Sequence, residues 1–269
     1  MIISLSNQKG GVGKTTLAFN LAHLLSEEFK ILAVDLDPQG NLSLAFGVEK
    51  EENRALAIFE RSPKIDPIPI SEQIDLVPSN IELSRVESNV TLSTYGKLKN
   101  ALREARGNYD FIIIDCPPSL GVFTLSAFMA SDFVLVPITP ALFSLAGTRD
   151  LIDTVYMIKQ DGYNPSIEML GFVLNMVDRT TVARSVEGML RENFGDKVFR
   201  TFIPRTVRVE EAVHQSKPVH VCFPNHKAAF AFRSLKEISR LTPPFDFSGF
   251  PTRSSYTCLL YTSDAADEG

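Results

Sequence analysis

The amino-acid sequence predicts a single α/β domain, in which helices cover both faces of a mostly parallel, twisted sheet. Short apolar runs alternate with longer amphipathic segments along the chain of 269 residues, and this alternation is typical of a parallel sheet wrapped by helices. Several runs, among them Phe111–Asp115 and Phe133–Pro137, are apolar almost throughout, as are strands buried on both faces. A glycine-rich loop between the first strand and the first helix is the third observation.

The expected strands are short and rich in aliphatic and aromatic residues, which favour extended backbone. In chain order they cover Ile2–Ser6, Ile31–Asp35, Ile74–Val77, Phe111–Asp115, Phe133–Pro137, Leu170–Asn175 and Val198–Phe202. Helical patterns lie between them, and they cover Lys14–Glu27, Tyr95–Arg106, Thr124–Ala130, Ser144–Lys159, Thr181–Phe194 and Lys227–Leu241. There is no internal repeat, and the only loose segment is the proline-rich Pro63–Pro69. We therefore expect one domain over residues 1–249.

The composition excludes several classes of protein. With 44% hydrophobic and 22% charged residues, the chain is neither disordered nor a collagen or a coiled coil. No apolar run approaches the ~18 residues that a membrane span needs, and the first residues lack the features of a secretory signal. Cys116, Cys222 and Cys258 have no metal-ligand spacing and are too few for a disulfide scaffold. We expect a globular cytoplasmic protein without integral membrane association.

The end of the chain differs in character from the rest. Cys258 to Glu268 reads CLLYTSDAADE, which resembles one reading frame of a transposase-type sequencing adapter. The preceding Phe250–Ser255 resembles another adapter translation, more loosely. We interpret 250–269 as a non-native read-through tail and exclude it from the fold.

Charge is distributed unevenly along the chain. Residues Arg179–Arg240 hold twelve Lys/Arg and six Asp/Glu, a net charge of +6, whereas the whole chain carries −5. The remainder of the chain is therefore acidic. This asymmetry suggests a surface that faces a polyanion, although ordinary surface solvation explains it equally well.

The glycine-rich loop has the character of a phosphate-binding loop. Residues 7–16 read NQKGGVGKTT, and the glycines let successive backbone N–H groups face inward as an anion-binding nest at a helix N-terminus. Lys14 adds a positive charge for the β- and γ-phosphates of ATP, and the Thr15 hydroxyl can ligate Mg²⁺. The usual pattern G-x-x-x-x-G-K-[ST] would place glycine where this chain has Gln8, and a second lysine, Lys9, follows. We predict that ATP contacts Lys9, Gly10, Gly11, Val12, Gly13, Lys14, Thr15 and Thr16.

With this loop the sequence resembles the ParA/Soj/MinD family of P-loop ATPases, whose loop is the deviant Walker A. Three further segments are similar to family motifs in order and spacing: Asp35–Asn41 (DLDPQGN), Asp115–Gly121 (DCPPSLG) and Ile203–Arg208 (IPRTVR). The resemblance covers about residues 1–241, and the DPQGN form is closer to the ParA/Soj branch than to MinD. It implies a single-domain P-loop NTPase.

Acidic residues follow two of the expected strands, where a γ-phosphate and its metal would lie. By the resemblance, Asp37 is the catalytic carboxylate that orients the attacking water, and Asp35 supports the metal from its outer shell. Asp115 ends a buried apolar run, where a charge needs a strong reason to be. Reaching Mg²⁺ through a water would supply that reason.

The resemblance also implies roles for residues beyond the phosphate site. In the family, the lysine at the Lys9 position crosses the interface of an ATP-dependent homodimer and contacts the partner's phosphates, like an arginine finger. Asn175, Pro204 and Arg205 resemble positions that contact adenine. Cys116 lies beside the switch loop, where a small buried residue is the better interpretation than an iron–sulfur ligand.

Basic residues near the last two helical regions could follow DNA phosphates without reading sequence. The candidates are Arg184, Arg191, Lys197, Arg200, Lys217 and Lys227. The family binds DNA nonspecifically as the ATP dimer, but these positions do not match it one by one. Two departures bear on partners: Ala141–Gly147 lacks the acidic residue usual in the family, and Lys217–Lys227 is less basic than in relatives.

Together these observations predict a ParA/Soj-like ATPase that partitions a chromosome or plasmid, or positions another cargo. It would associate with the nucleoid when bound to ATP, and a ParB-like protein would stimulate its hydrolysis. Because the chain begins almost directly with the first strand, sequence-specific operator binding is not expected. Two alternatives stay open: a MinD-like ATPase on the membrane, which needs a C-terminal amphipathic helix, and a nucleotide sensor that does not hydrolyse ATP.

Overall fold

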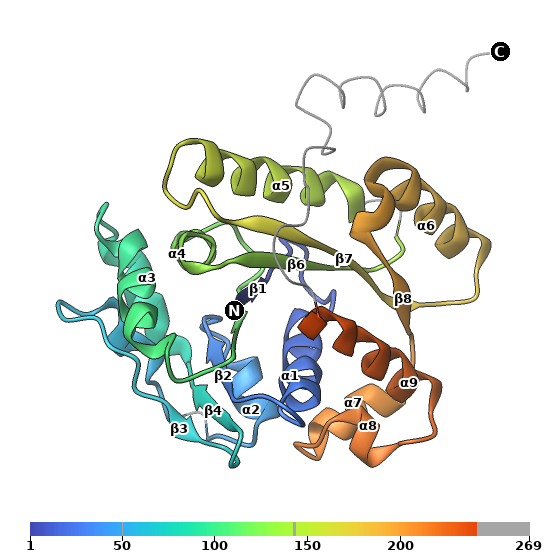
Figure 1. The fold of residues 1–269 in the computed structure, drawn as a ribbon, viewed down its shortest axis with the longest axis horizontal. Helices are drawn as coiled ribbons and strands as arrows, with labels where there is room; N and C mark the ends of the chain where they lie inside the picture. The colour runs from blue at the N-terminus through green and yellow to red at the C-terminus, as the bar shows by residue number, and fades with distance from the viewer. Residues whose placement is uncertain (50, 142–143, 241–269) are drawn as a thin grey trace.

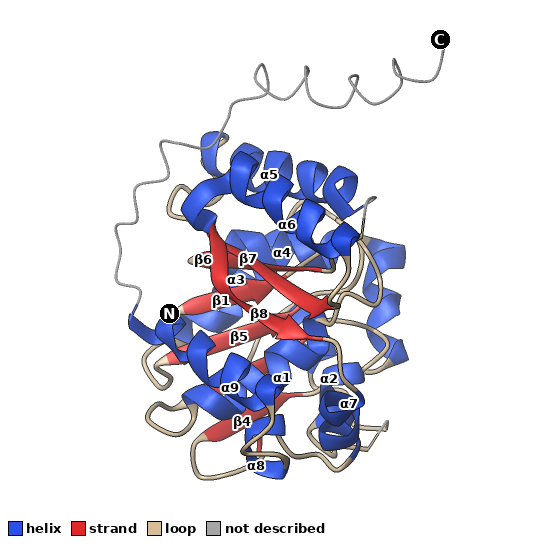
Figure 2. Ribbon diagram, turned by 90° about the vertical axis from the view of Figure 1, so that its right-hand side faces the viewer, coloured by secondary structure: helices blue, strands red, loops and turns tan. Residues whose placement is uncertain are grey.

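The computed structural model describes residues 1–49, 51–141 and 144–240, and these form one eight-stranded sheet between two layers of helices (Figures 1 and 2). The strand order is β3-β4-β2-β5-β1-β6-β7-β8. All neighbouring strands are parallel except β3 and β4. The strands are β1 (Ile2–Leu5), β2 (Ile31–Asp35), β3 (Ile68–Pro69), β4 (Ile74–Val77), β5 (Phe111–Asp115), β6 (Phe133–Ile138), β7 (Glu168–Val177) and β8 (Val198–Pro204). The predicted α/β class is confirmed.

Helices cover both faces of the sheet, and neighbouring strand residues face opposite layers. Their bounds are α1 (Lys14–Leu25), α2 (Asn41–Ala45), α3 (Thr94–Ala105), α4 (Val122–Ala130), α5 (Ser144–Gln160), α6 (Thr181–Phe194), α7 (Val207–His214), α8 (Val219–Cys222) and α9 (Lys227–Ser234). On β5, Ile113 packs in the core with α1 and α9, whereas Ile112 and Ile114 pack with α3 and α4. Helices α5 and α6 cover β6 and β7 on the latter side. The sheet is therefore buried on both faces, which explains its apolar strands.

Three differences from the sequence prediction have physical reasons. Strand β3 lies inside the proline-rich segment, and Pro69 is tolerated there because β3 is an edge strand. The short helices α2, α7 and α8 have too few turns for a clear apolar period. The expected last helix ends at Ser234 and continues as 3₁₀ turns over Leu235–Arg240. The proposed read-through tail, 250–269, lies outside the described residues.

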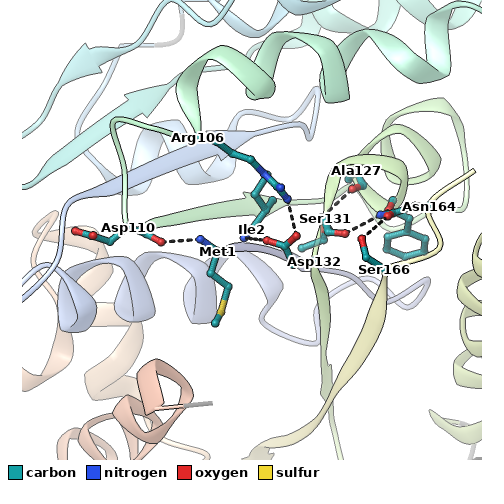
Figure 3. Close-up of polar contacts among 11 residues, drawn as sticks. Met1, Ile2, Arg106, Asp110, Ala127, Ser131, Asp132, Asn164 and Ser166 are labelled. Atoms are coloured by element: carbon teal, nitrogen blue, oxygen red, sulfur yellow. Dashed lines mark hydrogen bonds and ion pairs between the residues drawn. The ribbon is translucent and has the colours of Figure 1, made fainter. Parts of the chain in front are cut away.

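Polar contacts close the amino end of the sheet, opposite the carboxyl ends of the strands (Figure 3). Asp132 accepts a hydrogen bond from the Ile2 amide at 2.8 Å and pairs with Arg106. Asn164 is buried, and its amide donates to the carbonyls of Phe128 (2.8 Å) and Ser131 (2.7 Å) at the end of α4. These carbonyls have no partner within the helix, so Asn164 serves as a side-chain cap.

Replacing Asn164 with alanine is expected to destabilise the fold by about 2–3 kcal/mol, because two buried carbonyls lose their donor. The free energy of unfolding from urea titration measures the loss. Ser166→Ala is the matched control: it removes only the hydroxyl that donates to the side-chain oxygen Oδ1 of Asn164 at 3.0 Å and should cost less than about 1 kcal/mol. Equal losses in the two variants would contradict the capping role.

Two histidines lie in the apolar layer where α1 meets α8. The His23 ring packs edge-on against Phe19, with ring centroids 4.7 Å apart, and His220 is buried beside Glu27 at 3.4 Å. Among the described residues, Nε2 of His23 and Nδ1 of His220 have no hydrogen-bond partner. Burial, helped by the charge of His220, lowers the pKa of His23 to about 4, and burial also lowers the pKa of His220.

Lowering the pH from about 7.5 to about 5 is expected to destabilise the wild type relative to His23→Phe, a comparison in which the opposite contributions of the buried carboxyls Asp35 and Asp115 cancel. Its pKa near 4 in the folded state lies below the value of about 6.5 in an unfolded chain, so the unfolded chain binds more protons in between and stability falls with pH over that window. Allowing for partial exposure, we expect a loss of about 1–2 kcal/mol at pH 5. Urea titrations at both pH values measure it. His23→Phe keeps the ring packing and should show a smaller pH effect; an equal one would refute this origin.

Candidate nucleotide-binding site

The glycine-rich loop joins β1 to α1 at the carboxyl edge of the sheet, and two of its glycines have backbone conformations that other residues rarely adopt. Gly11 has φ +71° and Gly13 has φ +86°. A Cβ atom on Gly13 would lie 2.2 Å from Nδ2 of Asn175. Gly13 therefore permits both the left-handed turn that starts α1 and the close approach of β7.

Asn7 organises the start of this loop. The side-chain nitrogen Nδ2 of Asn7 donates to the Pro137 carbonyl at 2.8 Å, and the side-chain oxygen Oδ1 accepts a hydrogen bond from the backbone amide of Lys9 at 2.9 Å. The Lys14 ammonium donates to the Asn7 carbonyl at 3.1 Å. Lys14 is buried, and desolvation lowers its pKa although Asp115 acts in the opposite direction. A fixed positive charge thus lies beside the backbone nest, as a polyphosphate requires.

Two carboxylates lie side by side beneath the loop, since Asp35 and Asp115 are partners in the β2–β5 register. The Thr15 hydroxyl donates to Oδ2 of Asp115 at 2.6 Å. Oδ1 of Asp115 is buried and has no hydrogen-bond partner among the described residues. Burial, and then the charge of Asp35, raises the pKa of Asp115 well above its usual value. This orphaned oxygen and the adjacent hydroxyl fit a hydrated Mg²⁺.

Asp35 is held by residues that sequence reasoning did not find. Its Oδ2 accepts from the Ser43 amide (2.9 Å) and hydroxyl (2.7 Å), and the Ser43 hydroxyl accepts the Ser79 amide at 2.9 Å. Burial raises the pKa of Asp35 to about 7 despite these bonds. The short helix α2, which begins at Asn41 of the DPQGN motif, therefore positions the Asp35 carboxylate.

A cavity of about 570 Å³ opens over the loop. Its lining includes Gly10, Gly11, Gly13, Lys14, Thr15, Thr16 and Asp37 from the predicted set. It also includes Gln39, Asn41, Leu44, Ala45, Pro118, Val213 and His214, for which no role was predicted. Asp37 is 8% exposed and accepts the Gln39 amide at 3.0 Å. The cavity thus brings together Lys14, Thr15 and Asp37, whereas Lys9, Val12, Asp35 and Asp115 are not among its lining residues.

Sequence comparison identifies the family. A family model described as an AAA domain matches residues 1–169. Over 255 residues the chain is 38% identical to the sporulation initiation inhibitor protein Soj of Bacillus subtilis. This alignment covers 88% of the present chain and 98% of the Soj protein. Over 230 residues it is 40% identical to the chromosome partitioning protein ParA of Myxococcus xanthus, covering 81% and 80%. The chain belongs to the ParA/Soj family of P-loop ATPases.

Structural comparison agrees with this family assignment. A cobyrinic acid a,c-diamide synthase from Mycobacterium smegmatis, solved with a bound ATP analogue and magnesium, is 30% identical to this chain. The match has a TM-score of 0.76 and covers 88% of this chain and 94% of that one. The resemblance drawn from the deviant Walker A loop and the three further motifs is confirmed.

The residues predicted to contact adenine in this ParA/Soj-family chain do not line the cavity over the loop. Asn175 is buried near the end of β7 and is not a lining residue of the cavity. Its side-chain nitrogen Nδ2 donates to the Val12 carbonyl at 2.8 Å, and its side-chain oxygen Oδ1 accepts a hydrogen bond from the backbone amide of Met176 at 2.9 Å. Arg205 is exposed and pairs with Asp178 at 2.9 Å, next to the buried Pro204. Asn175 thus anchors the phosphate loop through one N–H group of its side-chain amide.

The predicted DNA residues of this ParA/Soj-family chain lie in different environments. The Arg191 guanidinium pairs with Glu187 at 2.9 Å and donates to the carbonyls of Val198 and Phe199, so it ties α6 to β8. Lys197 is partly buried. Four others are exposed: Arg184, Arg200, Lys217 and Lys227. Three of the four belong to α6, β8 and α9, and these elements lie toward the viewer in Figure 2.

Lys9 differs from Lys14 in its surroundings although both belong to the loop. Its side chain is exposed, and among the described residues its ammonium makes no hydrogen bond or ion pair. The loop beside it lines the cavity. A charge placed in this way is available to a group outside its own subunit.

No helix in the described residues is both long and apolar enough to cross a membrane.

Proposed function

We propose that this chain is a partitioning ATPase. It binds ATP with Mg²⁺, closes as an ATP-bound sandwich homodimer on nonspecific DNA, and releases DNA after hydrolysis. The related Soj and ParA proteins are named for sporulation control and chromosome partitioning, which supports a role in moving a chromosome, a plasmid or another cargo. A ParB-like protein would stimulate hydrolysis.

The proposal gives roles to four side chains in or beneath the cavity. The loop amides and Lys14 bind the β- and γ-phosphates, and the Thr15 hydroxyl with Asp115 would hold Mg²⁺, the latter through water. Bound Mg²⁺ would neutralise charge on the phosphate oxygens. Asp37 orients the attacking water in line with the leaving group, because positioning is most of what phosphoryl transfer requires of a protein.

The observation that supports a dimer is that the Lys9 ammonium is exposed and, among the described residues, unpaired. Lys9 directly precedes Gly10, which lines the cavity. Lys14 already supplies the phosphate charge from within the subunit. A second lysine whose ammonium makes no hydrogen bond or ion pair among the described residues fits a role in trans, on the phosphates of a partner. Exposed Arg184, Arg200 and Lys227 would then be presented to the DNA backbone by each subunit.

Cosedimentation of the full chain with random-sequence DNA tests the proposal, under ATP, ADP and no nucleotide, at low and high salt. We expect DNA to be retained only with ATP. Retention should be lost at high salt, because contacts between Lys or Arg and DNA phosphates weaken as the salt concentration rises. Lys9→Ala should abolish retention, whereas Arg191→Ala should reduce it no more than any loss of folding explains.

An ATP-dependent dimer that retains no DNA under any nucleotide would exclude the partition mechanism. Vesicles containing anionic lipids would then replace DNA in the same assay, and retention on them would favour the MinD-like alternative. Equal, negligible turnover in the wild type and in Asp37→Ala would instead favour a sensor that does not hydrolyse ATP.

A further inference from the structure

The last turn of α7 contributes a titratable side chain to the nucleotide cavity. Among the described lining residues, only Lys14, Asp37 and His214 have titratable or charged side chains. Lys14 and Asp37 have assigned roles, whereas neither the motifs nor the resemblance pointed to His214. It lies far along the chain from the phosphate loop, and the fold brings it there.

The backbone next to His214, whose side chain is exposed, forms an uncommon turn. Ser216 has φ +50°, one of two non-glycine residues with positive φ in the described chain. Its amide donates to the Val213 carbonyl at 2.9 Å. A Cβ atom on Gly47 would lie 3.2 Å from the Ser216 hydroxyl oxygen, so this turn packs against the segment that ends α2. The ends of α2 and α7 therefore form one wall of the cavity, and His214 is part of that wall.

A bound nucleotide would change the balance of charge around His214. Within the cavity Lys14 and Asp37 have opposite charges, and α2 contributes no charged side chain. On α7 itself Glu211 pairs with Arg208 at 2.7 Å, and Glu210 is exposed. Lys217 follows the turn, and His220 is buried in the core beyond it. A triphosphate would add several negative charges to this balance.

We propose that His214 is a nucleotide-contacting residue, which donates a charge-assisted hydrogen bond from its imidazolium to a phosphate oxygen of the bound nucleotide. The contact strengthens binding at acidic pH and weakens as the imidazole loses its proton. It couples α7, which begins directly after β8 and the exposed Arg205, to occupation of the cavity. The inference requires only nucleotide binding, and it is independent of DNA binding and of dimer formation.

Equilibrium binding of AMPPNP with Mg²⁺ tests this contact, at about pH 6 and about pH 8.5. The variants are His214→Gln, which cannot be protonated, His214→Lys, which keeps a positive charge at both values, and Gln215→Ala, an exposed neighbour outside the cavity lining. At pH 6 we expect the dissociation constant of AMPPNP to be roughly tenfold higher for His214→Gln than for the wild type. At pH 8.5 the difference should be less than about threefold. His214→Lys should bind well at both, and Gln215→Ala should match the wild type.

Other groups in the site also titrate, so the decisive quantity is the ratio of dissociation constants of variant and wild type at each pH. A ratio near one at both pH values for His214→Gln, in a variant whose thermal unfolding is unchanged, would overturn the proposal. A ratio that is raised but independent of pH would also overturn it, because it indicates packing. The same titration with ADP locates the contact: a loss confined to AMPPNP places it at the γ-phosphate, and an equal loss places it nearer the α- and β-phosphates.

Discussion

Replacing Asp37 with alanine is expected to slow ATP hydrolysis by roughly a hundredfold or more while AMPPNP still binds. Asp37 lines the same cavity as Lys14 and Thr15 of its own subunit. One of its carboxylate oxygens accepts the Gln39 amide, and no hydrogen bond to the other is found among the described residues. That second oxygen is available to a water molecule. Removing it takes away an interaction needed in the transition state and leaves the phosphate contacts in place.

Single-turnover hydrolysis and equilibrium AMPPNP binding measure the two effects separately. Asp37→Asn is the matched control, because it keeps an oxygen that can accept the Gln39 amide and removes only the charge. If the charge orients or partly deprotonates the water, both variants lose turnover alike. Turnover above about a tenth of the wild-type rate in Asp37→Ala would refute the catalytic assignment. Loss of AMPPNP binding would indicate a collapsed loop instead.

Local sequence signals predicted the phosphate loop and every strand of the sheet except β3, because these features depend on neighbouring residues. Apolar runs identify buried strands, and glycines at fixed spacing identify a nest. The partner of Asp35 was not predictable in this way: Ser43 reaches it only because α2 turns back over β2. The position of His214 at the cavity was equally unpredictable, because no motif around it in the sequence indicates phosphate binding. Such contacts arise from tertiary packing of short helices, whose positions local periodicity does not determine.

Contacts within the chain also changed the interpretation of residues whose type was suggestive. Arg191 looks like a DNA-binding residue in the sequence, yet its guanidinium is used between α6 and β8. Asn175 follows the expected pattern of a strand-end residue, yet its amide holds the Val12 carbonyl. In both cases the residue type indicated a hydrogen-bonding capacity, and only the three-dimensional arrangement shows which groups use it.

Replacing Lys9 with alanine is expected to slow hydrolysis by roughly a thousandfold, the scale of a positive finger supplied in trans. Nucleotide binding by the isolated subunit should change little, because Lys14 and the loop amides stay in place. Lys9→Arg is the control that keeps the charge and should retain more activity than Lys9→Ala. Single-turnover hydrolysis at a protein concentration that saturates dimer formation measures the effect. Full activity in Lys9→Ala would show that the exposed ammonium has no part in the reaction.

Mixing Lys9→Ala with Asp37→Ala distinguishes action in trans from action within one subunit. In a mixed sandwich dimer, the site of the Lys9→Ala subunit keeps its own Asp37 and receives Lys9 from its partner, so it is complete. The other site lacks both groups. Random pairing makes half of the dimers mixed, each with one active site of two, so the mixture should recover roughly a quarter of the wild-type rate. If Lys9 acted on the nucleotide of its own subunit, every site in the mixture would lack one group, and mixing two inactive variants would restore nothing.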